Sequence, residues 1–99
     1  MRDFSKGKIY TIRCRSDVSK IYVGSTTQPL SKRWGDHKHC WKSGNHLPFH
    51  KLIEDINDWY IELYEAFPCQ NNEELTRREG QIMREIATLN KNSSNYHLD

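Results

Sequence analysis

Residues 8–24 read KIYTIRCRSDVSKIYVG, and this stretch decides the fold. In its first seven residues the side chains alternate between two faces, one with Tyr10, Ile12 and Cys14 and the other with Ile9, Thr11 and Arg13. Residues 16–19 are rich in turn formers, and residues 20–24 are again β-branched and aromatic. The stretch therefore predicts a β-hairpin, whose register the sequence does not set.

A helical pattern follows the hairpin. Spacings of four, three and four place one stripe on a helix from Leu30 to about Trp41, formed by Leu30, Trp34, His37 and Trp41. The hydroxyls of residues 25–27 and Pro29 suit the start of this helix, and residues 43–45 suit its end. A second short helix is expected from Pro48, with a buried side formed by Phe49, Leu52, Ile53 and Ile56.

Two more elements complete the expected fold. Residues 59–64 alternate as a third strand, and a last helix is expected from about Glu73 to Thr88, capped by Asn71 or Asn72. The order β-β-α-α-β-α predicts an α+β fold, a three-stranded antiparallel sheet flanked by helices. We expect a single domain over residues 1–99, with its core at about 7–92 and a polar tail at 93–99.

Composition excludes several classes of protein. Only 35% of the 99 residues are hydrophobic, but three Trp, five Tyr and three Phe supply enough bulk for one modest core. No apolar run approaches the ~20 residues that span a bilayer, and no signal-peptide pattern is present. Cys14, Cys40 and Cys69 form no CxxC pair and are expected to be reduced thiols. We expect an intracellular protein of the cytoplasm or nucleus, neither secreted nor bound to a membrane.

The charge is unevenly distributed, although the formal net charge is only +2. Residues 31–51 carry five basic residues against one acid, together with four histidines, and residues 54–79 carry eight acids against two arginines. A basic segment followed by an acidic one suits a polyanion site beside a metal site. Ordinary solvated helix faces are the commoner explanation of any single charge cluster.

Two polar residues interrupt apolar helical stripes. Glu79 lies about 30° from the centre of the last helix's stripe, where a carboxylate needs a cation, a metal or a strong donor as partner. A salt bridge to an arginine, or a stripe with a wet edge, would explain it equally well. His37 interrupts the first helix's stripe, where a hydrogen-bonded core histidine is the ordinary explanation. Arg33 lies one turn earlier, and its guanidinium suits phosphate oxygens.

The hairpin carries the most specific signal, two triplets that read Lys8-Ile9-Tyr10 and Tyr22-Val23-Gly24. They resemble the paired motifs of the GIY-YIG nuclease superfamily, with eleven residues between them. The resemblance covers about residues 7–92 and, in the family's order, matches its arginine, histidine, metal-binding glutamate and terminal asparagine to Arg33, His37, Glu79 and Asn90. Lys8 replaces the first-motif glycine, and Gly80 follows the glutamate where a helix former is expected.

The resemblance implies a stand-alone, metal-dependent DNA endonuclease. In family terms Tyr10 is the base and Tyr22 positions water or phosphate, and these two roles are open to exchange. Arg33 would stabilise the transition state, His37 would accept the proton of Tyr10, and Glu79 would hold one Mg²⁺ or Mn²⁺ ion. Double-stranded or branched DNA is the expected partner, bound through Lys32, Lys38, Lys42 and Asn90. A homodimer would be one route to double-strand cleavage.

Three other interpretations remain open at this point. The first is a zinc site within the dense run of His37, His39, Cys40, His46 and His50, although no standard His/Cys spacing is present. The second is a DNA-binding module that keeps the fold without the activity. The third is the catalytic core of a larger restriction, homing or repair nuclease. Each tyrosine, taken singly, would also serve as a strand aromatic that packs over a helix.

Overall fold

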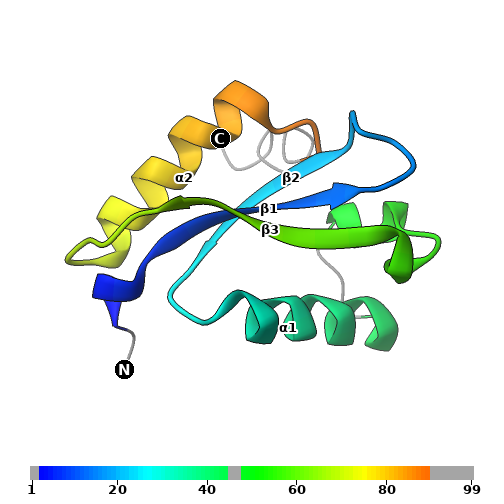
Figure 1. Ribbon diagram of the computed structural model, residues 1–99, viewed down its shortest axis with the longest axis horizontal. Helices are drawn as coiled ribbons and strands as arrows, with labels where there is room; N and C mark the ends of the chain where they lie inside the picture. Colours follow the sequence, from blue (N-terminus) through cyan, green and yellow to red (C-terminus); the bar gives the residue numbers. More distant parts are fainter. Residues whose placement is uncertain (1–2, 45–47, 90–99) are drawn as a thin grey trace.

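The chain folds around a three-stranded sheet with one long helix on each side (Figure 1). The structure is a computed structural model, and it describes residues 3–44 and 48–89. In chain order the elements are η1 (Phe4–Lys6), β1 (Lys8–Cys14), β2 (Ile21–Thr26), α1 (Leu30–Ser43), η2 (Pro48–Leu52), η3 (Ile56–Asp58), β3 (Trp59–Ala66) and α2 (Asn72–Ile86). No helix of the described part is long and apolar enough to cross a membrane.

β1 is the central strand, paired antiparallel with β2 on one side and with β3 on the other. The hairpin register, which the sequence left open, pairs Tyr10 with Gly24 and Ile12 with Tyr22. Tyr10 and Tyr22 therefore share one face of the sheet. The β1–β3 ladder shifts register between Ile9 and Tyr10, and such irregularities commonly re-aim a side chain beside a functional site. The predicted α+β fold class is confirmed.

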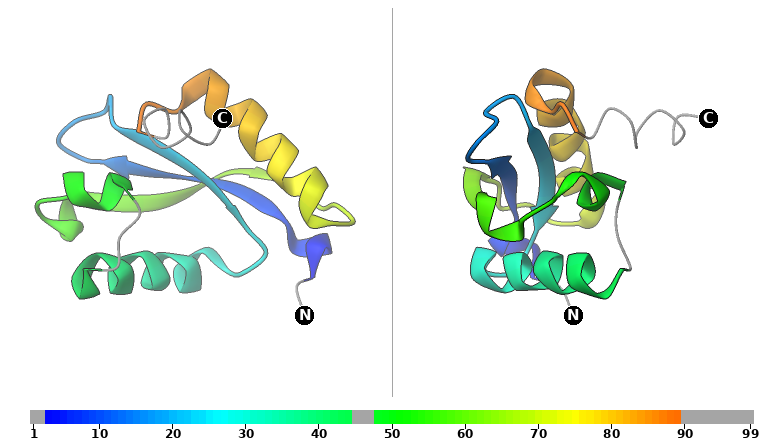
Figure 2. Two further views of the ribbon diagram at one scale, coloured as in Figure 1. Left: turned by 180° about the vertical axis from the view of Figure 1, so that it is seen from behind. Right: turned by 90° about the vertical axis from the view of Figure 1, so that its right-hand side faces the viewer.

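The two faces of β1 feed two separate cores. On one face Tyr10 and Ile12 pack with Trp34 and Trp41 of α1, and on the other Ile9 packs with Leu75 and Ile82 of α2. Figure 2 shows the two helices on opposite sides of the sheet. Because helices cover both faces, the four successive residues 9–12 of β1 are all buried. Residues on opposite faces of the sheet can therefore meet only around its edges.

The helix ends follow their local sequences. α1 runs two residues beyond the predicted Trp41 and ends at Gly44, whose φ of 83° is the left-handed conformation that glycine tolerates best. α2 begins after Asn71, whose side chain accepts a 2.9 Å hydrogen bond from the backbone N–H of Glu74. α2 ends at Ile86, two residues before the predicted end at Thr88.

The second helix expected from Pro48 is wrong in type. Residues 48–52 form a single 3₁₀ segment, η2, rather than an α-helix. Its three residues per turn do not place side chains at α-helical spacings on one side. Leu52 is 47% exposed instead of buried, while Ile53 is buried and Ile56 is partly buried. The side chain of Phe49 lies outside the described residues.

Candidate active site

Tyr10 lies at the centre of the candidate site because Gly24 leaves room for its ring. Tyr10 is fully buried, and a Cβ atom at Gly24 would come within 2.5 Å of its phenol oxygen and of the ring carbon that bears it. Any side chain at position 24 would displace the Tyr10 ring, so the observed position of the first-triplet tyrosine requires the glycine of the second triplet. The two triplets act as one unit in the folded protein.

Helix α1 supplies both hydrogen-bond partners of the Tyr10 hydroxyl. The Nε of Arg33 donates to the phenol oxygen at 3.1 Å, and Nε2 of His37 lies 2.8 Å from the same oxygen. The two residues are four apart, so they project from the same side of α1. Burial raises the pKa of the Tyr10 phenol, and the charge of Arg33 opposes that rise. The phenol is therefore protonated at neutral pH.

His37 is buried among aromatic and basic groups. Its ring meets the rings of Tyr10 and Tyr22 edge-on, each at a centroid separation of 5.9 Å, and its Nδ1 lies 3.1 Å from Nε2 of His50. Burial lowers the pKa of His37 to about 3, helped by the nearby charge of Arg33 and by His50. At neutral pH its imidazole is therefore neutral, and one of its ring nitrogens can accept a hydrogen bond. Burial also raises the pKa of Tyr22.

Glu79 contacts the end of β2 at Ser25, from the face of the sheet opposite to that of Tyr10. Ser25 pairs with Ile9, so its side chain points toward α2, where its hydroxyl donates to Oε1 of Glu79. Burial raises the pKa of the Glu79 carboxyl, and the Ser25 hydrogen bond and Arg33 oppose this rise. Glu79 is therefore within electrostatic reach of Arg33. Its partner is a hydroxyl rather than an arginine, unlike the salt bridge considered from the sequence.

An open cleft of about 1090 Å³ runs past Ser25 and Arg33. Its lining includes four basic residues, Lys6, Lys8, Lys32 and Arg33. Nζ of Lys8 donates to the backbone carbonyl of Gln28 at 2.9 Å, so the lysine that replaces the motif glycine ties β1 to the loop before α1. The cleft thus combines cationic side chains with direct access to Arg33, as a phosphate-binding surface requires.

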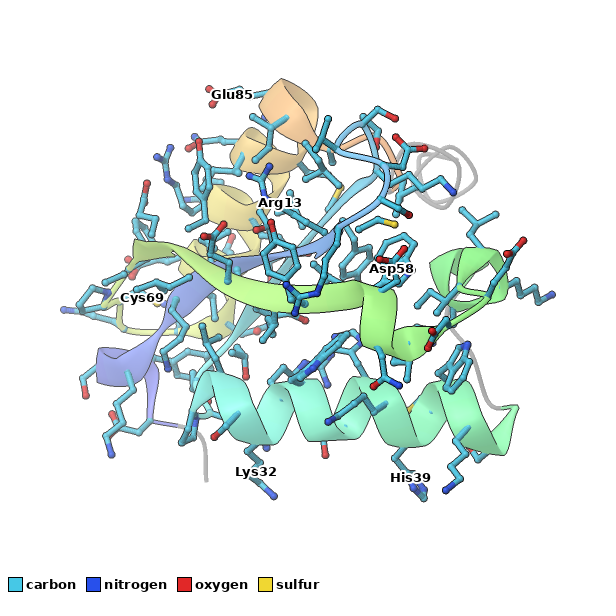
Figure 3. The ribbon with its side chains drawn as sticks, turned by 45° about the vertical axis from the view of Figure 1, so that its right-hand side comes forward. Arg13, Lys32, His39, Asp58, Cys69 and Glu85 are labelled. Atoms are coloured by element: carbon cyan, nitrogen blue, oxygen red, sulfur yellow. The ribbon has the colours of Figure 1, made fainter. Side chains whose placement is uncertain are left out.

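The predicted DNA-binding lysines differ in their position relative to the cleft. Lys32 lines the cleft, and its exposed side chain projects from the side of α1 that faces away from the sheet, as that of His39 does (Figure 3). Lys38 is exposed with its Nζ 6.0 Å from the centre of the Trp34 ring, and Lys42 is exposed in the last turn of α1. Neither is among the residues that line the cleft. Asn90 lies outside the described residues.

Sequence reasoning missed three residues of this region. Ser25 follows the second triplet directly but was read only as a helix-capping hydroxyl. Lys6 lies just before the first triplet, and its position in the cleft depends on how η1 folds against β1. His50 was weighed only as a zinc ligand, and its contact with His37 depends on the irregular path of η2. Only proximity to the triplets in sequence signalled the first two.

The donor set suits a hard divalent cation held by one carboxylate. Glu79 offers Oε2 in addition to the oxygen that accepts from Ser25. Mg²⁺ retains several waters and often takes only one or two protein carboxylates. Within residues 3–44 and 48–89, no three His, Cys, Asp or Glu side chains are grouped to hold a metal ion. His46 of the zinc interpretation lies outside these residues, and the described part gives that interpretation no support.

Comparison with known proteins identifies the family and a shared fold. A family model described as the GIY-YIG catalytic domain matches residues 6–95, and the chain belongs to this family. Among solved structures, the catalytic domain of the homing endonuclease I-TevI is similar, with a TM-score of 0.67 and 24% sequence identity. The match covers 82% of this chain and 88% of that one, and it shows a shared fold. No protein of curated function gave a significant match. Family membership confirms the predicted class of enzyme.

Proposed function

We propose that this GIY-YIG domain is a metal-dependent endonuclease that hydrolyses phosphodiester bonds of DNA. The observation that carries the proposal is the buried Tyr10 hydroxyl, held between Nε of Arg33 and Nε2 of His37. Of these three residues, Arg33 also lines the cleft that contains Lys6, Lys8 and Lys32. One turn of α1 thus carries both a phosphate-binding cation, Arg33, and a proton acceptor, His37, and the lysines of η1, β1 and α1 add a polyanion surface beside Arg33. Family membership supports the same class of reaction.

Tyr10 is the proposed base, acting through His37. The hydrogen bond to His37 is the feature that favours Tyr10 over Tyr22 for this role. As a water oxygen attacks phosphorus, its proton passes to the Tyr10 oxygen while the phenolic proton passes to Nε2 of His37. The P–O3′ bond breaks, and its electron pair stays on the leaving oxygen. No free phenolate is needed, which matters because burial raises the pKa of Tyr10.

Arg33 has two successive roles in this proposal. In the free protein it donates to the Tyr10 hydroxyl, which is otherwise buried. When DNA enters the cleft, its guanidinium turns to the phosphate, which uncovers Tyr10 and stabilises the charge of the transition state. Tyr22 stays protonated because burial raises its pKa, and its phenol positions the water or the phosphate.

Glu79 would hold one Mg²⁺ or Mn²⁺ ion through its carboxylate, with Ser25 fixing its orientation. Such an ion supplies positive charge for the non-bridging and leaving oxygens of the phosphate. The raised pKa of Glu79 fits this role, since a carboxyl held in a buried place gains from a bound cation. One carboxylate is sufficient because water and phosphate provide the remaining ligands.

DNA would lie along the cleft, with Lys6, Lys8 and Lys32 on its phosphates. Lys38, Lys42 and Asn90 remain proposed contacts for DNA that extends beyond the cleft. Dimerisation for double-strand cleavage and an intracellular site of action also remain proposals. The latter is supported by the three cysteines, which are all free thiols.

A cleavage assay on plasmid, single-stranded and branched DNA tests the proposal. We expect cleavage with Mg²⁺, none with excess chelator, and a loss of at least about 100-fold in Arg33→Ala. Arg77→Ala is the matched control, because Arg77 is exposed on α2 and, within the described residues, forms its ion pair with Glu73 of the neighbouring turn. Cleavage that survives chelation contradicts the proposal. DNA binding without cleavage by the unaltered chain favours the non-catalytic module or a core that needs further domains.

A further inference from the structure

His50 extends the hydrogen-bonded chain beyond the residues assigned to catalysis. It is 1% exposed, it comes from η2 rather than from the sheet or a long helix, and its Nε2 lies 3.1 Å from Nδ1 of His37. The rings of the two histidines meet edge-on at a centroid separation of 5.3 Å. A continuous path therefore runs from the Tyr10 oxygen through both nitrogens of His37 to His50.

The donors along this path favour one tautomer of His37. Arg33 has no acceptor and must donate to the Tyr10 oxygen, which leaves the phenolic hydrogen free to point at His37. Nε2 of His37 then accepts, so in the neutral ring the hydrogen lies on Nδ1. That hydrogen in turn requires an acceptor, and Nε2 of His50 is in the correct place.

We infer that His50 is a positioning residue, which accepts the Nδ1 hydrogen of His37 and so keeps the Nε2 lone pair of His37 directed at Tyr10. The inference rests on the proposed roles of Tyr10 and His37. Without such an acceptor, the ring of His37 would be free to change tautomer and present an N–H to Tyr10, which blocks proton transfer. The role parallels that of the outer hydrogen-bond partners that orient ligand or catalytic histidines in other enzymes.

Two substitutions separate this role from simple packing. His50→Gln retains an acceptor that reaches the position of Nε2, whereas His50→Phe retains the ring volume without an acceptor. We expect the single-turnover cleavage rate to fall on the order of 10- to 100-fold in His50→Phe, with unchanged DNA affinity, and to recover substantially in His50→Gln. His39→Phe, on the exposed side of α1, is the matched control. Full activity in His50→Phe, or equal loss in both variants, overturns the inference.

Nitrogen NMR of the DNA-free protein gives a second readout that does not depend on cleavage. The imidazole nitrogen shifts report which ring nitrogen carries the hydrogen. We expect His37 to be protonated at Nδ1 in the unaltered protein and in His50→Gln, and to show a changed tautomer distribution in His50→Phe. A hydrogen on Nε2 in the unaltered protein overturns the inference. If the chain cleaves no DNA, the proposed function fails, yet this measurement still decides the role of His50.

Discussion

Gly24→Ala is the substitution with the most specific predicted effect. The added Cβ would lie 2.5 Å from both the phenol oxygen and Cζ of Tyr10, and 2.9 Å from Cε1. Ordinary contact begins near 3.4 Å. The backbone of Gly24 is held by its pairing with β1, so the end of the Tyr10 ring must move by about 0.9 Å. That displacement is enough to carry a 2.8 Å hydrogen bond past its 3.5 Å limit.

The expected effect is larger on activity than on stability. Overpacking of a buried site costs about 1–3 kcal/mol, and loss of a buried hydrogen bond adds roughly 1 kcal/mol. A 1 Å misplacement of a reacting group costs about 100-fold in rate. We therefore expect a folded variant that unfolds at a lower temperature and cleaves DNA roughly 100-fold more slowly than the unaltered protein.

The assay is single-turnover cleavage of plasmid DNA, together with thermal unfolding of the free protein. Gly35→Ala is the matched control, because a Cβ at this exposed position of α1 meets nothing within 4 Å. This control should cleave DNA normally and unfold at an equal or higher temperature. If Gly24→Ala cleaves DNA as fast as the control, Tyr10 either has room to move or has no part in the reaction.

Three further predictions follow from the same contacts. The pKa of His37 is lowered to about 3 in the folded chain, so between about pH 6.5 and pH 3 the unfolded chain binds a proton that the folded chain does not. The free energy of unfolding should therefore fall by roughly 1 kcal/mol per pH unit toward pH 4, more steeply than in His37→Gln. The free energy of unfolding is measured by denaturant titration at each pH, and an equal pH dependence in the two proteins would contradict this prediction. Gly80→Ala should stabilise α2 by about 1 kcal/mol, because among the described residues the added Cβ would meet the Arg84 side chain at an ordinary 3.6 Å. The expected result is a higher melting temperature, and a lower melting temperature would show that the backbone at position 80 requires glycine. Arg33→Lys keeps the charge but loses the Nε donor to Tyr10, so cleavage should fall on the order of 100-fold at unchanged fold; near-normal rates would show that charge alone suffices.

The sequence predicted the elements that depend on local pattern. Alternation in residues 8–14, the helical stripe through Trp34 and the cap at Asn71 are local features, and all three are present in the structure. Helix periodicity alone also placed Glu79 at the buried side of α2. Its partner could not be predicted in this way, because Ser25 reaches Glu79 only through the hairpin register and the packing of α2 on β2.

Features set by tertiary packing remained hidden. The sequence offered no reason for Gly80 within α2, and among residues 3–44 and 48–89 no close approach requires a glycine there. His50 lies in an irregular segment that carries no periodicity, so only the folded chain reveals its contact with His37. The predicted roles of Lys38 and Lys42 rested on segment charge, which does not specify which side of α1 faces the cleft.

The central claim is that one cation, bound by the Glu79 carboxylate, completes a hydrolytic site. Removal of the carboxylate charge tests this claim most directly. The measurement is the single-turnover rate of plasmid cleavage at increasing Mg²⁺ in Glu79→Gln, which preserves an oxygen for the Ser25 hydroxyl. Glu73→Gln is the control, since Glu73 is exposed on the same helix and pairs only with Arg77. The account predicts a loss of at least about 100-fold in Glu79→Gln and a normal rate in the control. Cleavage by Glu79→Gln at the unaltered rate and with the unaltered Mg²⁺ dependence would contradict it.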